Sequence, residues 1–421
     1  MHQGRVITIL GSAGGVARAV LALLNHAAQD VNDPLHAVIN QCHLHLVDRK
    51  KKPGSYYRKL LPGLQSQFTT HQFNLANLPR FREHLRQTQT TIVIDVSWAD
   101  TLEMLRCCNG LGIAYVNTAL ENRIVDEHEE TYKGFPLMER LRVMDHAKED
   151  FTNTTAILCS GMNPGVVQWM ALELMKDRPG ETPLGCYIVE HDSSFFANPS
   201  LARPESIYTT WAPECFLDEA ILSFPMFMNH HTPVFLHEPV YALEFKVTLG
   251  AKQFDGCLMP HEEVYTLCKH YAMEGGFLYK INAHTTDLIR AHLDRQDDLW
   301  DLEMQVLDPT RASLAGEDLV GVLLVYRDKE RYMYNVLTNQ ETFARFGVNA
   351  TYFQVASGVY GALATLLLDS IPQGIYYVDE LLRQTGSRYG VYVTHCLRDF
   401  VVGENDRSDG LLLQRMKRVD V

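Results

Sequence analysis

Short apolar runs of strand length alternate with helical patterns through roughly the first 180 residues. Val6–Leu10 is the first such run, and apolar positions spaced three and four residues apart begin at Val16. The alternation continues with strand-like runs at 44–47, 68–73, 91–96, 113–117 and 156–159 and helical patterns at 78–86, 101–108, 138–148 and 166–175. Uninterrupted apolar strands separated by helices are typical of a parallel sheet with both faces covered. We therefore predict an α/β fold with a doubly wound parallel sheet.

A glycine-rich turn joins the first predicted strand to the first helix, and an acid follows the second strand. Glycines let the backbone approach a pyrophosphate, and a helix N-terminus offers N–H donors and partial positive charge. An acid at the tip of the next strand accepts hydrogen bonds from a ribose. This order predicts a Rossmann dinucleotide site at Gly11, Ser12, Ala13, Gly14, Gly15, Val16 and Asp48.

The turn departs from the usual fingerprint, which leaves an alternative open. It has the pattern G-x-x-G-G-x-A rather than G-x-G-x-x-G, and Asp48 lies beyond the usual offset of about 20 residues. A tight strand-to-helix turn without a ligand is the alternative interpretation. Asp48 favours NAD, because a carboxylate repels a 2′-phosphate, whereas the basic residues at 49–52 are able to receive one. We predict NAD as the cofactor.

Polar residues follow the later predicted strands, where a doubly wound sheet binds its ligand. We expect Asp95, Ser97, Thr118 and Asn163 to contact the cofactor, and Glu121 is a further candidate for the site. Asn163 precedes Pro164, so a helix N-cap with proline at the first helical position is its structural alternative.

After residue 178 the pattern changes to short β-like segments separated by turns. These segments lie at 186–190, 241–247, 319–326 and 332–337, and an apolar helix rich in small residues follows at 352–368. Fewer long helices and more turns are typical of an α+β domain with a mainly antiparallel sheet. We predict a dinucleotide-binding domain at 1–178, completed by 350–421, and a substrate and catalytic domain at 179–349.

Composition narrows the class of partner. Of the 421 residues, 38 are Lys or Arg and 51 are Asp or Glu, and the net charge of −13 argues against nucleic acid. We find no uninterrupted run of about 18 apolar residues and no secretory pattern at the N-terminus, so we expect no membrane partner and a cytoplasmic location. The nine cysteines are scattered without a C-x-x-C pair, so we expect reduced thiols and no metal site.

Several short motifs appear in a fixed order between about residues 90 and 380. They are T-A-L-E at 118–121, C-S-G-M-N-P-G-V-V-Q-W at 159–169, E-H-D at 190–192, T-W followed by Glu214 and Glu219 at 210–219, H-E at 261–262, D-L-V-G-V-L-L at 318–324 and N-A-T-Y-F-Q-V-A-S at 349–357. In this order they resemble segments of bacterial homospermidine synthases, which belong to a wider saccharopine dehydrogenase-like group.

The resemblance implies an enzyme that uses bound NAD as a redox shuttle while it transfers an aminobutyl group between polyamines of the putrescine and spermidine class. It implies catalytic roles for Asn163, Glu190, Trp211, Glu219 and His261 and substrate binding by Glu121 and Glu214. Carboxylates suit a cationic amine, and the indole face of Trp211 suits a cationic imine. We expect a homodimer.

Departures from the family pattern leave the substrate open. The chain has Val96-Ser97-Trp98-Ala99 where the family has D-T-S-S. A saccharopine- or carboxyspermidine-type dehydrogenase that consumes NAD(P)H is one alternative, and Arg123 and Arg203 are the arginines that would serve its carboxylate substrates. A nucleotide-sensing protein without catalysis is the other. Each site residue also has a structural alternative: packing for Trp211, an ion pair for Glu190, a solvated helix face for Glu219 and an exposed helix start for His261.

Overall fold

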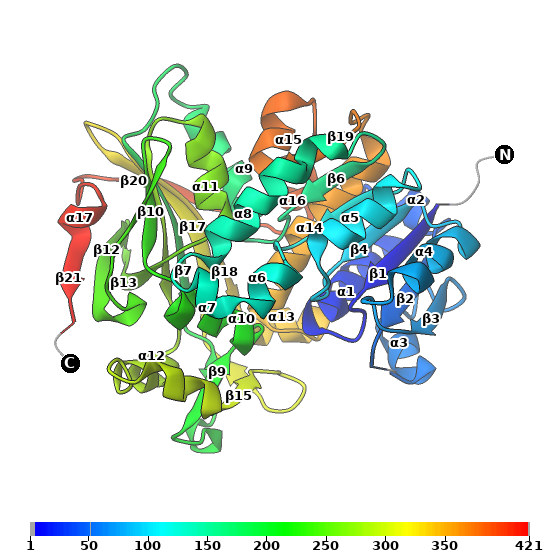
Figure 1. The fold of residues 1–421 in the computed structure, drawn as a ribbon, viewed down its shortest axis with the longest axis horizontal. Coiled ribbons are helices and arrows are strands. Elements are labelled where there is room, and N and C mark those ends of the chain that lie inside the picture. The colour runs from blue at the N-terminus through cyan, green and yellow to red at the C-terminus, as the bar shows by residue number, and fades with distance from the viewer. Residues whose placement is uncertain (1–4, 51, 420–421) are drawn as a thin grey trace. The chain divides into compact units, whose positions relative to one another are not determined.

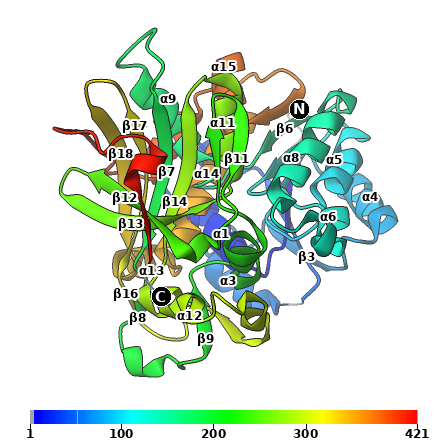
Figure 2. The same cartoon turned by 60° about the vertical axis from the view of Figure 1, so that its left-hand side comes forward.

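The computed structural model describes residues 5–50 and 52–419, except the side chain of Glu129. The chain divides into two compact units, shown in Figure 1 and, after a turn of 60°, in Figure 2. Unit 1 comprises Met1–Glu127, Glu139–Val166 and Phe353–Leu397, and unit 2 comprises His128–Met138, Val167–Tyr352 and Arg398–Val421. Each unit is built on its own sheet.

Unit 1 contains a seven-stranded sheet in the order β19-β6-β5-β4-β1-β2-β3. All neighbouring strands in it are parallel. The strands are β1 (Val6–Leu10), β2 (His43–Asp48), β3 (Phe68–Gln72), β4 (Ile92–Asp95), β5 (Ala114–Asn117), β6 (Thr155–Leu158) and β19 (Gly374–Tyr377). The order from β3 to β6 is that of a Rossmann sheet. The predicted doubly wound parallel sheet is confirmed.

Helices alternate with these strands as the apolar pattern predicts. Those of unit 1 are α1 (Gly15–Gln29), α2 (His36–Ile39), α3 (Gly54–Leu60), α4 (Leu78–Gln87), α5 (Thr101–Asn109), α6 (Arg123–Glu127), α15 (Val378–Gln384) and α16 (Tyr389–Cys396), and α8 (Pro136–Ala147) lies mostly in this unit. The short helix α2 occupies the insertion that delays Asp48. It lies between α1 and β2, where a Rossmann fold of ordinary spacing passes directly into its second strand.

The long helix α14 (Ala350–Leu368) uses its small residues for close packing. A Cβ atom at Gly358 would lie 1.9 Å from the carbonyl oxygen of Gly161, so only glycine fits there. In length and composition α14 is apolar enough to cross a membrane, but 83% of its most apolar window is buried inside the structure. Such burial is what a core helix of a globular protein has.

Unit 2 contains a ten-stranded sheet with the main order β20-β18-β17-β7-β14-β13-β12-β21 and the hairpin of β10 and β11 attached through β14. Only β7 and β14 are parallel among its pairs. The strands are β7 (Gly185–Asp192), β10 (Met226–Asn229), β11 (Thr232–Phe235), β12 (Leu243–Leu249), β13 (Lys252–Met259), β14 (Glu274–Lys280), β17 (Glu317–Val325), β18 (Glu330–Thr338), β20 (Val401–Asn405) and β21 (Met416–Arg418). The second sheet is therefore mixed and mainly antiparallel, as predicted.

Shorter elements complete unit 2. Its helices are α7 (Glu129–Tyr132), α9 (Val166–Met175), α10 (Pro213–Leu217), α11 (Glu262–His270), α12 (Ala283–Arg290), α13 (Asn339–Phe346) and α17 (Leu412–Arg415). Two small two-stranded sheets pair β9 (Ser206–Thr209) with β15 (Glu303–Val306) and β8 (Phe195–Phe196) with β16 (Leu314–Ala315). These elements carry several of the predicted site residues.

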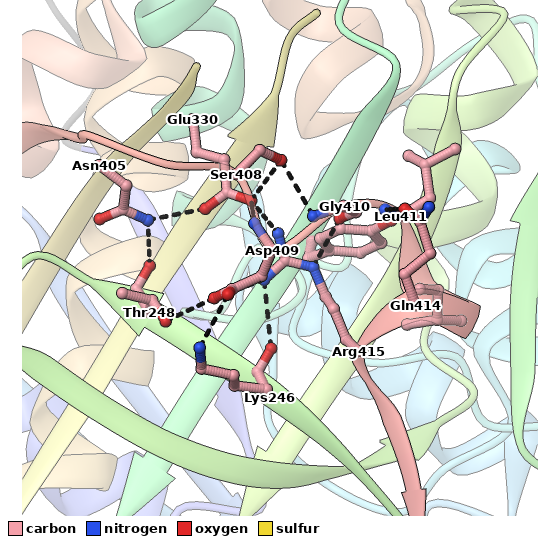
Figure 3. A network of polar contacts seen from close by, with 12 residues as sticks. Lys246, Thr248, Glu330, Asn405, Ser408, Asp409, Gly410, Leu411, Gln414 and Arg415 are labelled. Atoms are coloured by element: carbon pink, nitrogen blue, oxygen red, sulfur yellow. Dashed lines mark hydrogen bonds and ion pairs between the residues drawn. The ribbon is translucent and has the colours of Figure 1, made fainter. Parts of the chain in front are cut away.

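We expected residues 350–421 to complete the first domain, but Arg398–Val421 belongs to unit 2. β20 pairs with β18, and β21, red in Figures 1 and 2, pairs with β12. A polar network holds the segment to the sheet around the buried pair of Glu330 and Arg415 (Figure 3). The helix α9, expected in the first domain, also lies in unit 2, where Gln168 donates a hydrogen bond to Thr266.

Candidate functional site

The glycine turn between β1 and α1 has the geometry of a dinucleotide-binding turn. Gly11 has a φ of +74°, and a Cβ there would lie 2.6 Å from the carbonyl oxygen of Val96. A side chain at this position is therefore excluded on two counts, backbone conformation and space. The turn brings the start of α1 close to the carboxyl end of β4, where a doubly wound sheet binds its ligand.

The N-terminus of α1 is open toward an anion. Gly14 is the N-cap and supplies no side-chain cap, and the first turn carries no acid. The first N–H groups of a helix have no intrahelical partner and carry partial positive charge. They are suited to a pyrophosphate. Gly14, Gly15 and Val16 thus stand where the sequence predicts, at the helix start.

Asp48, at the end of β2, is hydrogen-bonded to the same turn. Its Oδ2 accepts the N–H of Ala13 at 2.9 Å, and its Oδ1 accepts the N–H of Lys50 at 2.6 Å. Ser12 is buried, and its hydroxyl lies 3.1 Å from that of Tyr57. The carboxylate therefore holds the turn, and its contact with a ribose stays a prediction.

A small pocket is lined in part by Asp48. Lys50 and Lys52 line it together with Tyr57 and the end of β3, and Lys51 lies outside the described residues. The carboxylate of Asp48 repels the 2′-phosphate of NADP and therefore favours NAD. The ammonium groups of Lys50 and Lys52 attract that phosphate and therefore favour NADP.

The carboxylate of Asp95 makes its hydrogen bonds within the protein. It is buried, and its carboxylate accepts hydrogen bonds from the N–H and hydroxyl of Ser97 and, at 2.9 Å, from the hydroxyl of Tyr115. Burial raises the pKa of Asp95 to about 6, although these donors lower it. Beside it, Trp98 is 62% exposed. Asp95 therefore supports the strand end, and Ser97 is half-buried there.

The loop after β6 places Asn163 differently from the helix-cap expectation. α9 begins at Val166, so Pro164 is not its first residue. The N–H of Gly161 donates to the carbonyl of Pro164 at 2.7 Å, and the N–H of Val166 donates back to Gly161 at 3.0 Å. Asn163 thus lies at the tip of a tight loop. It is half-buried, as are Thr118 and Glu121 after β5.

In unit 2, acids gather on β7 and β17 next to two aromatic rings. Glu190 and Asp192 are two residues apart on β7, so they share one face of the sheet. Asp318 is the pairing partner of Asp192, and Tyr279 is that of Glu190. The indole Nε1 of Trp211 donates to the hydroxyl of Tyr279 at 3.4 Å. We call these five residues the strand cluster.

The carboxylates of the strand cluster are buried, and each disfavours ionisation of the others. Hydroxyl groups of Thr210 and Thr351 donate to Asp192 and Asp318, each at 2.5 Å. Burial raises the pKa of Asp318, and the charges of Glu190 and Asp192 raise it further. Burial also raises the pKa of Asp192. A cation beside these carboxylates would stabilise their ionised forms, because its opposite charge offsets the cost of their desolvation.

His261 is the N-cap of α11, and three glutamates lie near its ring. We call His261, Glu219, Glu262 and Glu263 the His261 cluster. His261 Nδ1 lies 2.5 Å from Glu263 Oε2, and Nε2 lies 3.9 Å from Glu219 Oε1. His261 is 7% exposed and Glu263 is 0% exposed, so the expected alternative of an exposed helix start is wrong. The ring of Phe277 lies 4.5 Å from His261 and stacks on Tyr279 at 5.8 Å, which links the two clusters.

Burial and charge set the protonation of the His261 cluster in opposite ways. Burial by itself lowers the pKa of His261, but the carboxylates of Glu263 and Glu219 outweigh it and raise that pKa to about 10. Burial raises the pKa of Glu219 to about 8, against the charge of His261. Ligand atoms of His261, Glu262 and Glu263 lie within 4.8 Å of one another, a spacing that is also able to hold a metal ion.

Other predicted residues lie apart from these clusters. Glu214 is exposed on α10. Arg203 donates to Glu303 at 2.5 Å, and Arg123 lies near Glu103 and Glu127 at 3.8 and 3.6 Å, all in surface ion pairs. The sequence did not point to Tyr279 or Glu263. The alternation E-H-D at 190–192 is the signal that was available for Asp192.

Comparisons with known proteins agree with the motif resemblance. Residues 7–146 match the family described as the saccharopine dehydrogenase NADP binding domain. A homospermidine synthase from Mesorhizobium japonicum is 22% identical over 349 residues, covering 67% of this chain and 68% of that protein. A solved apo saccharopine dehydrogenase (L-Glu forming) from Saccharomyces cerevisiae superposes with a TM-score of 0.58 at 10% identity, over 95% of this chain and 100% of that one. The resemblance to the saccharopine dehydrogenase-like group is confirmed, and the match at residues 7–146 supports a nucleotide-binding domain there.

Proposed function

We propose that this protein is an NAD-dependent enzyme of amine metabolism that makes or breaks a secondary amine through an imine, as homospermidine synthases do. The observation that carries the proposal is the strand cluster. Three buried carboxylates there accompany an indole and a phenol, and the described arginines that would serve an anionic substrate lie in surface ion pairs. Such a group of side chains suits a polycationic amine better than an amino acid.

A bound nicotinamide would accept a hydride from the carbon beside an amine nitrogen and return it later. Oxidation of that carbon leaves an imine, a second amine adds to it with loss of the first nitrogen as ammonia, and reduction of the new imine gives a secondary amine. No net redox change results. The cofactor is therefore needed only in catalytic amount.

In this proposal the residues of unit 2 have different roles, which follow from their chemistry. Glu190, Asp192 and Asp318 hold the ammonium groups of the substrate by charge. The face of Trp211 stabilises the cationic imine through cation–π attraction. Glu219, beside His261, accepts and returns protons, because only a neutral amine is able to lose a hydride or attack an imine. In unit 1, the glycine turn and Asp48 hold the dinucleotide.

Incubation of the purified protein with putrescine and trace NAD tests the proposal. We expect a secondary amine and ammonia to form over many turnovers per NAD, with no build-up of absorbance from reduced nicotinamide. Steady, stoichiometric formation of NADH would instead favour the dehydrogenase alternative. NAD binding without any conversion of a panel of diamines and amino acids would favour the nucleotide-sensing alternative.

A further inference from the structure

His261 lies between two carboxylates that contact opposite nitrogens of its ring. Glu263 Oε2 lies 2.5 Å from Nδ1, and Glu219 Oε1 lies 3.9 Å from Nε2. A ring held at Nδ1 has its other nitrogen fixed in direction, as in sites where a buried carboxylate orients a histidine.

Glu263 could serve only to stabilise the start of α11, but its complete burial is not explained by that role. Acids in the first turn of a helix are favourable because of the helix dipole, and Glu262 and Glu263 both lie in the first turn of α11. An exposed acid would provide that benefit without the cost of desolvation. Glu263 is 0% exposed, and its Oε1 is buried without a hydrogen-bond partner in the part of the chain that the structure describes.

We propose that Glu263 is a positioning residue that holds His261 as an imidazolium with Nε2–H directed toward Glu219, so that Glu219 exchanges the proton of the amine substrate. This inference rests on the proposed amine chemistry. It assigns Glu263, which touches no substrate, a role through His261. Glu219 is the group that faces the substrate, and its Oε2 is buried without a partner among the described residues.

The proton balance is simple. The ammonium R–NH3⁺ gives one proton to the Glu219 carboxylate, which becomes a carboxylic acid, and the amine is left neutral. That proton then passes to solvent, which leaves Glu219 ionised again. As the second, neutral amine adds to the imine carbon, its nitrogen gives one proton to Glu219, and Glu219 gives this proton to the nitrogen that leaves as ammonia. His261 stays protonated throughout, and its charge helps to keep Glu219 ionised between these steps, against the burial that raises the pKa of Glu219.

Histidine titration by NMR tests the positioning role without any need for activity. Ring-labelled protein is compared with Glu263→Gln, and the His261 signal is assigned by its loss in His261→Asn. We expect the pKa of His261 to fall toward the unperturbed value near 6.5 in Glu263→Gln. Glu262→Gln is the matched control, because Glu262 Oε2 lies 3.8 Å from the same Nδ1, and we expect it to change that pKa much less.

Kinetics supply the second arm. If the amine chemistry holds, Glu263→Gln should lower kcat at least about tenfold and move the acid limb of its pH profile, while KM changes little and Glu263→Asp restores part of the rate.

An unchanged His261 pKa in Glu263→Gln, or an equal fall in Glu262→Gln, would overturn the role of Glu263. Bound zinc or manganese that leaves with a chelator and is lost in Glu263→Gln would overturn it as well, in favour of a metal site. Failure to convert any amine, with the NMR result as expected, would count against the proposed function alone.

Discussion

The guanidinium of Arg415 and the carboxylate of Glu330 meet where both side chains are fully buried (Figure 3). Glu330 lies on β18, and Arg415 ends α17 near the C-terminus. Glu330 also accepts hydrogen bonds from Asn405 and Ser408, at 2.7 and 2.9 Å. One carboxylate thus joins two parts of the C-terminal segment to the central strands of unit 2.

Removing one member of this pair should destabilise unit 2 strongly. Arg415→Met leaves the Glu330 carboxylate buried without its cation, which costs about 3–5 kcal/mol. Urea unfolding followed by a probe in unit 2 should show a large fall in midpoint. The double variant Arg415→Met, Glu330→Met should lose less than Arg415→Met alone. Lys246→Met removes a half-exposed partner of Asp409 in the same network and should cost no more than about 1 kcal/mol. Equal losses in Arg415→Met and Lys246→Met would contradict the assignment.

Asp48 and the lysines beside it should set cofactor preference. We expect calorimetry to show NAD bound more tightly than NADP, because the carboxylate repels a 2′-phosphate. Asp48→Asn should narrow the gap by about 1–3 kcal/mol, the scale of charge-assisted hydrogen bonds. Lys52→Ala, in the pocket next to Asp48, should weaken NADP more than NAD. Tighter binding of NADP by the unmodified protein would reverse the choice of cofactor.

Trp211 should matter for turnover more than for cofactor binding. Trp211→Phe keeps a weaker π face but loses the hydrogen bond to Tyr279, so part of the activity should remain. Trp211→Ala should lose more, by about 0.5–2 kcal/mol of cation–π stabilisation plus packing. NAD affinity should stay nearly constant in both, as measured by calorimetry. A Trp211→Ala protein that folds, binds NAD and converts amines at the unmodified rate would show that Trp211 is only packing.

Unit 1 should lose stability in mild acid because of neighbouring histidines on β2, β3 and α4. His45 Nδ1 lies 2.8 Å from His71 Nε2, and the ring of His84 lies 4.5 Å from that of His71. Burial, with the charge of His71 adding to it, lowers the pKa of His45 to about 4 and that of His84 to about 3.

Between pH 6.5 and 4 the unfolded chain therefore binds more protons than the folded protein, so stability present above pH 6.5 is lost as pH falls through this window. Unfolding at several pH values should show the loss. His84→Phe should flatten the dependence on pH, and an unchanged slope would exclude His84 as a source.

The sequence determined the local elements and the glycine turn at which we predict the cofactor. Apolar runs of strand length such as Val6–Leu10 are typical of strands buried on both faces, and the glycine turn at Gly11 has no room for a side chain. Neighbouring residues along the chain build the turn, the helix start and most of their contacts. Periodicity and turn chemistry were therefore enough to place β1, α1 and β2.

Only the tertiary structure decided which acids meet and which segment belongs to which unit. Asp318 joins Asp192 because two strands distant in sequence pair in a particular register, which no local pattern specifies. His261 and Glu263 are buried because Phe277 and neighbouring strands cover the start of α11, whereas Glu214, just as acidic in sequence, remains exposed. The C-terminal residues lie in unit 2 because the buried charge of Glu330 and the open edges of β12 and β18 are satisfied there. Long-range pairing and the cost of burying charge, rather than local propensity, set these features.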